Sequence, residues 1–120
     1  MKVCVSSTGR ELTSSVDPRF GRASFFIFID SETKEYEAAA NGAGGAGGAG
    51  VQAANLVCEK KADCVLTGNI GPNAFSVLQT AGIDSFLGIE GTVEESLDMY
   101  LQNKLKKAED PSNAGHPGRI

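Results

Sequence analysis

Ser24-Phe-Phe-Ile-Phe-Ile-Asp30 is the strongest strand signal in this 120-residue chain, because aromatic and β-branched residues follow one another without a polar break. Such a run suits a central strand that is covered on both faces. The apolar residues 2–6 predict another buried strand before it. Residues 35–38 alternate and carry charge, which predicts a returning strand at the edge of the sheet.

Helix and strand signals alternate after this hairpin. Apolar spacing predicts a helix over residues 49–61, and residues 63–67 predict the next buried strand. Pro72 fits the first turn of a second helix, where no N–H is needed, and Gly82 fits its end.

A fifth strand and a third helix complete the domain. Residues 83–89 predict the strand, and Thr92-Val-Glu-Glu95 has the spacing of a capping box at the start of the helix. The helical spacing of apolar residues then continues to Leu105. Residues 108–120 carry prolines and glycines and little apolar surface, so we expect a mobile tail after a single domain of residues 1–107.

The order of these elements predicts the fold. Strands four and five each follow a helix, so both can lie parallel to strand one. The expected fold is α/β, with a mixed five-stranded sheet of order 3-2-1-4-5, an antiparallel strand two and three helices. This is the strand order of the ribonuclease H-like folds. The loops after strands one and four, residues 6–22 and 68–72, would then flank a crevice at the switch point of the sheet, where ligands usually bind.

Composition excludes several classes of partner. A net charge of −4 argues against nucleic acid as the ligand. No apolar run approaches the roughly 20 residues that span a bilayer, so no membrane association and a cytoplasmic location are expected. Cys4, Cys58 and Cys64 form no CxxC pair, which predicts free thiols. The apolar neighbours of Cys4 and Cys64 favour buried hydrophobic side chains over metal ligands.

The glycine-rich residues 42–50, GAGGAGGAG, formally fit the pattern GxGxxG. A triplet repeat produces that pattern automatically and the preceding strand is the edge strand, so no nucleotide is expected. A flexible connector is the simpler interpretation, with residues 42–47 mobile in the absence of ligand. The end of the segment differs, because at Gly50 a loop becomes a helix whose free N–H groups and positive dipole end suit an anion.

The residues do not indicate an enzyme. A nuclease of the ribonuclease H type needs carboxylates that hold two metal ions, but the first strand contains no acid and the fourth ends in Thr67-Gly-Asn69. The only histidine, His116, lies in the expected tail, where a general base would be hard to hold in place.

A binding surface for an anion remains. Arg19 and Arg22 lie in the loop after the first strand, and their guanidinium groups could pair with a ligand beside the helix starts at Gly50 and Gly71. Pairing of one or both arginines with Asp17 or another carboxylate is equally compatible with the sequence.

Five segments together carry a resemblance to a known family. They are Met1-Lys-Val-Cys-Val5, Phe20-Gly-Arg-Ala23, Gly48-Ala-Gly-Val-Gln-Ala-Ala54, Thr67-Gly-Asn-Ile-Gly-Pro-Asn-Ala-Phe75 and Gly91-Thr-Val-Glu-Glu95. In this order they resemble the dinitrogenase iron–molybdenum cofactor biosynthesis family, which includes NifX and the carboxyl-terminal domain of NifB. They span most of residues 1–105, and the fourth segment is the most specific.

The resemblance implies a ribonuclease H-like fold without nuclease activity, in a non-enzymatic protein that binds or carries an anionic iron–sulfur or iron–molybdenum cofactor precursor. Cofactor-biosynthesis proteins are the implied partners. A small interaction or regulatory domain that binds a protein segment or a metabolite, without a cluster, is the alternative. The candidate cofactor-binding residues are Arg19, Phe20, Gly21, Arg22, Gly48, Gly50, Thr67, Gly68, Asn69 and Gly71. No metal ligand and no catalytic residue is assigned.

Overall fold

A computed structural model describes residues 1–41 and 49–111 of the chain. The elements in chain order are β1 (Lys2–Ser7), β2 (Phe25–Asp30), β3 (Tyr36–Ala40), α1 (Ala49–Glu59), β4 (Cys64–Leu66), α2 (Pro72–Thr80), β5 (Asp84–Phe86) and α3 (Val93–Leu101). The five strands form one sheet of order β3-β2-β1-β4-β5. Strand β2 is antiparallel to both of its neighbours, whereas β4 is parallel to β1 and β5. The predicted order and directions are therefore confirmed.

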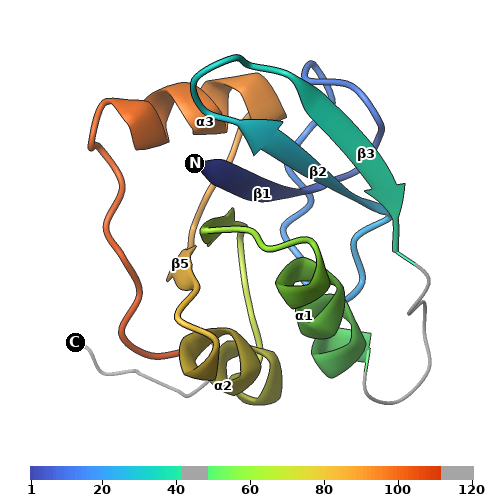
Figure 1. Cartoon of the computed structure of the whole chain (residues 1–120), viewed down its shortest axis with the longest axis vertical. Helices are drawn as coiled ribbons and strands as arrows, with labels where there is room; N and C mark the ends of the chain where they lie inside the picture. Colours follow the sequence, from blue (N-terminus) through green and yellow to red (C-terminus); the bar gives the residue numbers. More distant parts are fainter. Residues whose placement is uncertain (42–48, 112–120) are drawn as a thin grey trace.

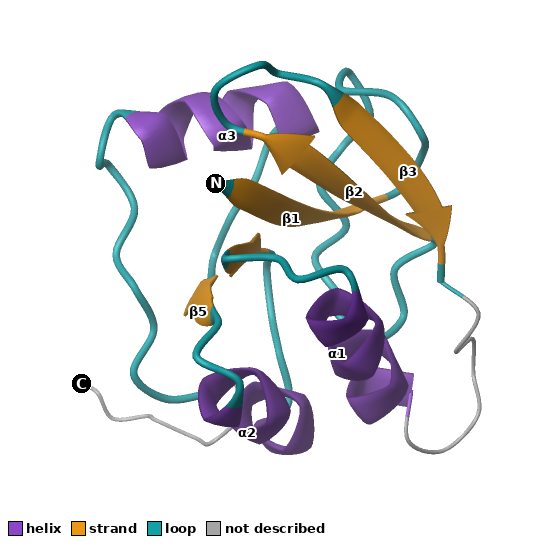
Figure 2. Cartoon of the chain, in the orientation of Figure 1, coloured by secondary structure: helices purple, strands orange, loops and turns teal. Residues whose placement is uncertain are grey.

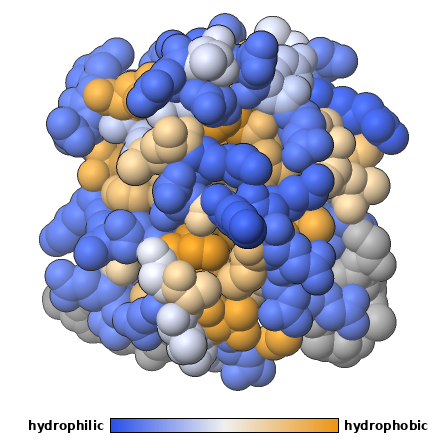
Figure 3. Space-filling model, viewed as in Figure 1, coloured by the Kyte–Doolittle hydropathy of each residue, from blue (hydrophilic) through white to orange (hydrophobic). Residues whose placement is uncertain are grey.

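The sheet is the middle of three layers, as Figures 1 and 2 show. Helices α1 and α2 cover one face, where Val57 and Leu78 join a buried cluster with Cys4 and Val65 of the sheet. Helix α3 covers the other face, where Leu97 belongs to a second buried cluster. The side of the molecule in view in Figure 3 is mostly hydrophilic, with smaller hydrophobic patches between the polar side chains.

The third helix is shorter than its apolar spacing predicts. It ends at Leu101, with Gln102 as its C-cap, and Asn103 then takes a positive φ of 59°. Leu105 therefore packs against the second cluster from an irregular segment rather than from the helix. This segment runs back to the edge of the sheet, where the Ala108 N–H donates to the Ser85 carbonyl oxygen at 2.7 Å.

Some predictions fall outside the described residues. They include the mobility of residues 42–47, the site residue Gly48, His116 and the part of the expected tail beyond Pro111. Within the described ranges, no helix combines the length and the apolar character needed to cross a bilayer.

Candidate anion-binding site

Three chain segments meet beyond the carboxyl ends of β1 and β4. These two strands run parallel, so the loops that follow them leave the sheet at the same end. Strand β3 also ends there, because it is antiparallel to β2, which is antiparallel to β1. Asn41, just after β3, donates from Nδ2 to the carbonyl oxygens of Gly21 at 3.0 Å and Ala23 at 2.9 Å. This side chain ties the end of β3 to the loop after β1.

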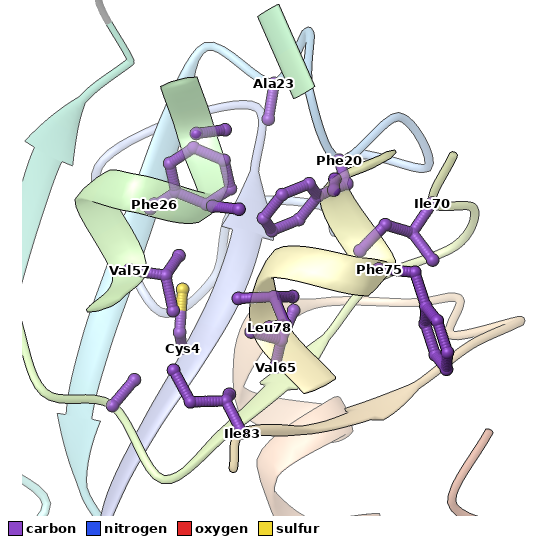
Figure 4. Packing of buried hydrophobic residues seen from close by; sticks show 14 of the residues in the cluster. Cys4, Phe20, Ala23, Phe26, Val57, Val65, Ile70, Phe75, Leu78 and Ile83 are labelled. Atoms are coloured by element: carbon purple, nitrogen blue, oxygen red, sulfur yellow. The ribbon is translucent and has the colours of Figure 1, made fainter. Parts of the chain in front are cut away.

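Phe20 fixes the loop after β1 on the core. Its side chain is 1% exposed, and its ring centroid lies 5.2 Å from that of Phe26. Figure 4 shows the Phe20 ring pointing into the cluster between Phe26 and Ile70. The predicted site residue Phe20 thus anchors its loop through burial of an aromatic ring.

A buried polar pair joins the ends of β1 and β4. Ser6 Oγ lies 2.6 Å from the Asp17 carbonyl oxygen and 2.7 Å from Thr67 Oγ1, both at hydrogen-bond distance. Ser6 and Thr67 are both fully buried. The Thr67 hydroxyl is therefore used in holding the two loops together, and its side chain does not reach the surface.

Two glycines of the predicted site make room for the backbone of another segment. A Cβ on Gly21 would lie 2.9 Å from the Gly50 N and Cα atoms, at the start of α1. A Cβ on Gly68 would lie 2.7 Å from the Pro18 Cα. Contacts this short exclude any side chain, so both glycines allow close approach between loops. Asn69 adds to this contact, because its N–H donates to the Pro18 carbonyl oxygen at 2.7 Å.

A pocket of about 220 Å³ lies where these segments meet the starts of α1 and α2. Its lining residues are Phe20, Gly21, Ala49, Gly50, Val51, Gly71, Pro72, Asn73 and Ala74. Four predicted site residues, Phe20, Gly21, Gly50 and Gly71, come together in it. Arg19, Arg22, Thr67, Gly68 and Asn69 are not part of the lining.

The two helix starts at the pocket differ from the start of α3. The N-cap of α2 is Gly71, which makes no side-chain capping hydrogen bond, and neither α1 nor α2 has an acidic residue in its first turn. At α3, Thr92 and Glu95 form the predicted capping box, and Glu94 and Glu95 lie in the first turn. The α3 start is thus satisfied by its own side chains, whereas α2 has no side-chain cap, and the positive dipole ends of α1 and α2 both lie at one pocket.

The two arginines near the pocket have different environments. Asp17 is 2% exposed, and its carboxylate accepts from the Arg19 N–H at 2.9 Å, from Nε at 3.3 Å and from Nη2 at 3.4 Å. The pairing with Asp17 that the sequence allowed is therefore present. The Arg19 side chain is still 63% exposed, so its guanidinium keeps a solvent-facing side. Arg22 is also exposed.

Two of the three thiols, those of Cys4 and Cys64, lie in the buried clusters on the two faces of the sheet. Burial raises the pKa of the Cys4 thiol well above its usual range, and burial also raises the pKa of the Cys64 thiol to about 11. Neither residue is among the described residues that line the pocket. Residues 1–41 and 49–111 contain no group of three His, Cys, Asp or Glu side chains placed to hold a metal ion.

Fold and pocket define a small α/β domain with a compact, side-chain-poor pocket at the switch point of its sheet. Residues 1–103 match the family model described as dinitrogenase iron–molybdenum cofactor. The chain belongs to this family.

Several relatives share nearly the whole domain. The apo form of the orange protein from Desulfovibrio gigas is 36% identical, with a TM-score of 0.91 over 93% of this chain and 96% of that one. A Thermotoga protein provisionally named NifB is 31% identical, with a TM-score of 0.83 over 95% and 98% of the two chains. An uncharacterized protein of Methanocaldococcus jannaschii is 32% identical over 98 residues, which are 78% of this chain and 83% of the relative.

Sequence reasoning missed two asparagines. Asn41 holds the end of β3 to the loop after β1, and Asn73 is the one residue with a polar side chain among the described residues that line the pocket. Asn73 could have been found, because it follows Pro72 in the first turn of a predicted helix. Asn41 gave no comparable signal, since its partners lie 18 and 20 residues away.

Proposed function

We propose that this protein is a non-enzymatic carrier that binds an anionic iron–sulfur or iron–molybdenum cofactor precursor in the pocket between α1 and α2. The convergence of two helix starts without acidic residues on one pocket is the observation that supports this most strongly. Membership of the dinitrogenase iron–molybdenum cofactor family supports a cofactor precursor as the cargo. The 36% identical orange protein is described in an apo form, a term for a protein without its bound group.

The cargo is held by hydrogen bonds rather than by metal–ligand bonds. Among the described residues, the pocket lining contains no Cys, His, Asp or Glu. A preassembled cluster brings its own sulfides, and these accept hydrogen bonds from backbone N–H groups. Asn73 and the exposed side of Arg19 supply side-chain donors near the helix starts. Such binding suits a carrier, because release requires no exchange of metal ligands.

The pocket size favours a compact anion. Its volume of about 220 Å³ lies below the roughly 300–1,000 Å³ of sites for drug-sized ligands. A nucleotide would extend beyond it. A small cluster or cluster fragment matches both the size and the positive dipole ends.

Anaerobic reconstitution tests the proposal. Protein incubated with iron, sulfide and molybdate, then desalted, should retain iron and show charge-transfer absorption in the visible range. Arg19→Ala and Arg22→Ala should each weaken retention, whereas Arg10→Ala, which removes a guanidinium that lies 4.7 Å above the Phe25 ring, should not. A wild-type protein that stays colourless and iron-free would contradict the carrier function and favour an interaction or regulatory domain.

A cysteine-free variant tests the mode of binding. Replacing Cys4, Cys58 and Cys64 by alanine removes every thiol, and circular dichroism can confirm that the fold is kept. The variant should retain the cluster as the wild type does. A folded variant that binds no cluster would show that thiolates hold the cargo.

A further inference from the structure

We propose that two copies of this chain join their sheets at β3, by antiparallel pairing of residues 36–40 with the same residues of the second copy. Strand β3 is the last strand at one edge of the sheet, as Figure 1 shows. Among the described residues, no segment pairs with its outer side. None of its residues lines the candidate anion-binding site, so the inference does not depend on the proposed carrier function.

The two edges of the sheet differ. At the outer side of β5, Lys107 forms an antiparallel bridge with Phe86. The Ala108 N–H donates to the Ser85 carbonyl oxygen at 2.7 Å, so the segment after α3 covers this edge. An uncovered edge strand is a template for pairing with another chain, and proline or a bulge commonly prevents this. Residues 36–40 contain no proline and pair with β2 in continuous register, so β3 keeps a regular open ladder.

Hydrogen bonds at both ends of β3 show which backbone groups are open. The Asn41 N–H donates to the Ser24 carbonyl oxygen at 3.0 Å, and the Asp30 N–H donates to the Glu35 carbonyl oxygen at 2.9 Å. Hydrogen-bonded pairs alternate along an antiparallel ladder, so the odd-numbered residues of β3 use their backbone groups on β2. The N–H and C=O groups of the even-numbered residues therefore point outward.

A two-fold register uses every outward group. With Ala38 opposite Ala38 of the second copy, Tyr36 lies opposite Ala40, and each facing pair exchanges two N–H···O bonds. Ala38 packs against the cluster under α3, so Tyr36 and Ala40 lie on that same face of the sheet. The Tyr36 side chain, which is 41% exposed, then lies beside a methyl group rather than beside a second ring.

The charged residue of β3 does not oppose this pairing. Glu37 lies opposite Ala39 of the second copy, so like charges do not face each other directly across the joined strands. The Glu37 carboxylate is also paired within its own chain, with Lys60 Nζ at 3.1 Å. The joined sheet therefore carries this glutamate as one half of an ion pair.

Unlike charges on the α3 face favour a second copy as the occupant. Glu11 accepts from the Tyr36 hydroxyl at 3.0 Å, and the Arg10 guanidinium lies 4.7 Å from the centroid of the Phe25 ring. Phe25 pairs with Ala40 in the sheet. Tyr36 of one copy thus lies in one row with Ala40 and Phe25 of the other. The row brings Glu11 of each copy toward Arg10 of its partner, which is the charge complementarity of a specific contact.

Sedimentation equilibrium of the full chain should show a reversible dimer. The dissociation constant should be on the order of 100 μM, because two short strands form a small interface. Amide hydrogen exchange should slow at Tyr36, Ala38 and Ala40 as the protein concentration rises. Exchange at Glu37 and Ala39, which already bond to β2, should not change. A chain that stays monomeric at about 1 mM would overturn the proposal and leave the edge to a strand of another protein.

Two double variants test the register. Tyr36→Glu with Ala40→Glu places like charges opposite each other in the dimer, whereas Tyr36→Glu with Ala40→Lys places unlike charges there. Both positions are exposed, so circular dichroism should show the same fold for both variants. At low salt the first variant should dissociate roughly tenfold more readily than the second. Equal dissociation constants, or protection of amides outside β3 on dimerisation, would overturn the proposal.

Discussion

Asp17 and its neighbours show how single residues hold the candidate anion-binding site. The Asp17 backbone carbonyl accepts from Ser6, and its buried carboxylate binds Arg19. The sequence placed Asp17 and Arg19 near each other but could not decide whether they pair, because the distance depends on how the loop folds over β1. The fixed guanidinium keeps an exposed side beside the pocket loop.

Gly68 and Gly50 provide a matched test of the loop packing. Gly68→Ala should destabilise the protein by roughly 1–3 kcal/mol, since the new Cβ would lie 2.7 Å from the Pro18 Cα. Gly50→Ala should change stability by less than about 0.5 kcal/mol, because its Cβ would meet the Ala74 Cβ at 3.4 Å, an ordinary contact. Urea denaturation compares the two variants. Equal stability of both would show that the loops do not pack this closely.

The Cys64 thiol should make the stability of the folded protein depend on pH in the alkaline range. Burial raises the pKa of its thiol from 9.0 to about 11. Between these values the unfolded chain loses the proton and the folded chain keeps it, so the stabilisation is complete below pH 9 and is lost as the pH rises to 11. The loss amounts to roughly 2 kcal/mol.

Denaturation of Cys64→Ala across this range measures that contribution. Between pH 8.5 and 11, the free energy of unfolding of the variant should fall by less than that of the wild type. The difference should not exceed the roughly 2 kcal/mol assigned to the thiol. Cys58→Ala is the control, because Cys58 is only half-buried on α1. Identical pH profiles for wild type and Cys64→Ala would exclude the raised pKa.

Among the elements, the starts of helices were predictable and one end was not. Pro72 and the Thr92–Glu95 capping box fix the starts of α2 and α3 through local chemistry that the sequence displays. The end of α3 depends on Asn103, whose positive φ turns the chain away, and on the hydrogen bond from Ala108 to Ser85. Leu105 kept helical spacing with α3, but tertiary contacts determine its actual position.

The α3 start should be sensitive to its cap. Thr92→Ala removes the hydroxyl that accepts from the Glu95 N–H at 3.1 Å and should cost about 1 kcal/mol of stability. Thr80→Ala, at the exposed end of α2, is the control and should change stability by less than about 0.5 kcal/mol. Thermal denaturation compares them. A loss no larger at Thr92 than at Thr80 would mean that the capping box does not stabilise α3.

In the whole molecule, the sheet order brings distant segments to one pocket. The order and directions of the strands followed from the helical connections, which place the loops after β1 and β4 at one edge. Four residues of the predicted site line the pocket at this end of the sheet. The remaining lining, such as Asn73 and Val51, depends on how α1 and α2 pack side by side, and no local pattern encodes that contact. The family resemblance seen in the sequence is confirmed over residues 1–103.

The proposed anionic cluster should lie at the starts of α1 and α2, held without thiolate ligands. Paramagnetic broadening of amide signals locates such a cluster directly in the ¹⁵N-labelled protein after reconstitution with iron, sulfide and molybdate. The strongest broadening should fall on the pocket residues Gly50, Val51, Asn73 and Ala74. Broadening centred on Cys58 or Cys64, with the pocket signals unchanged, would contradict the claim.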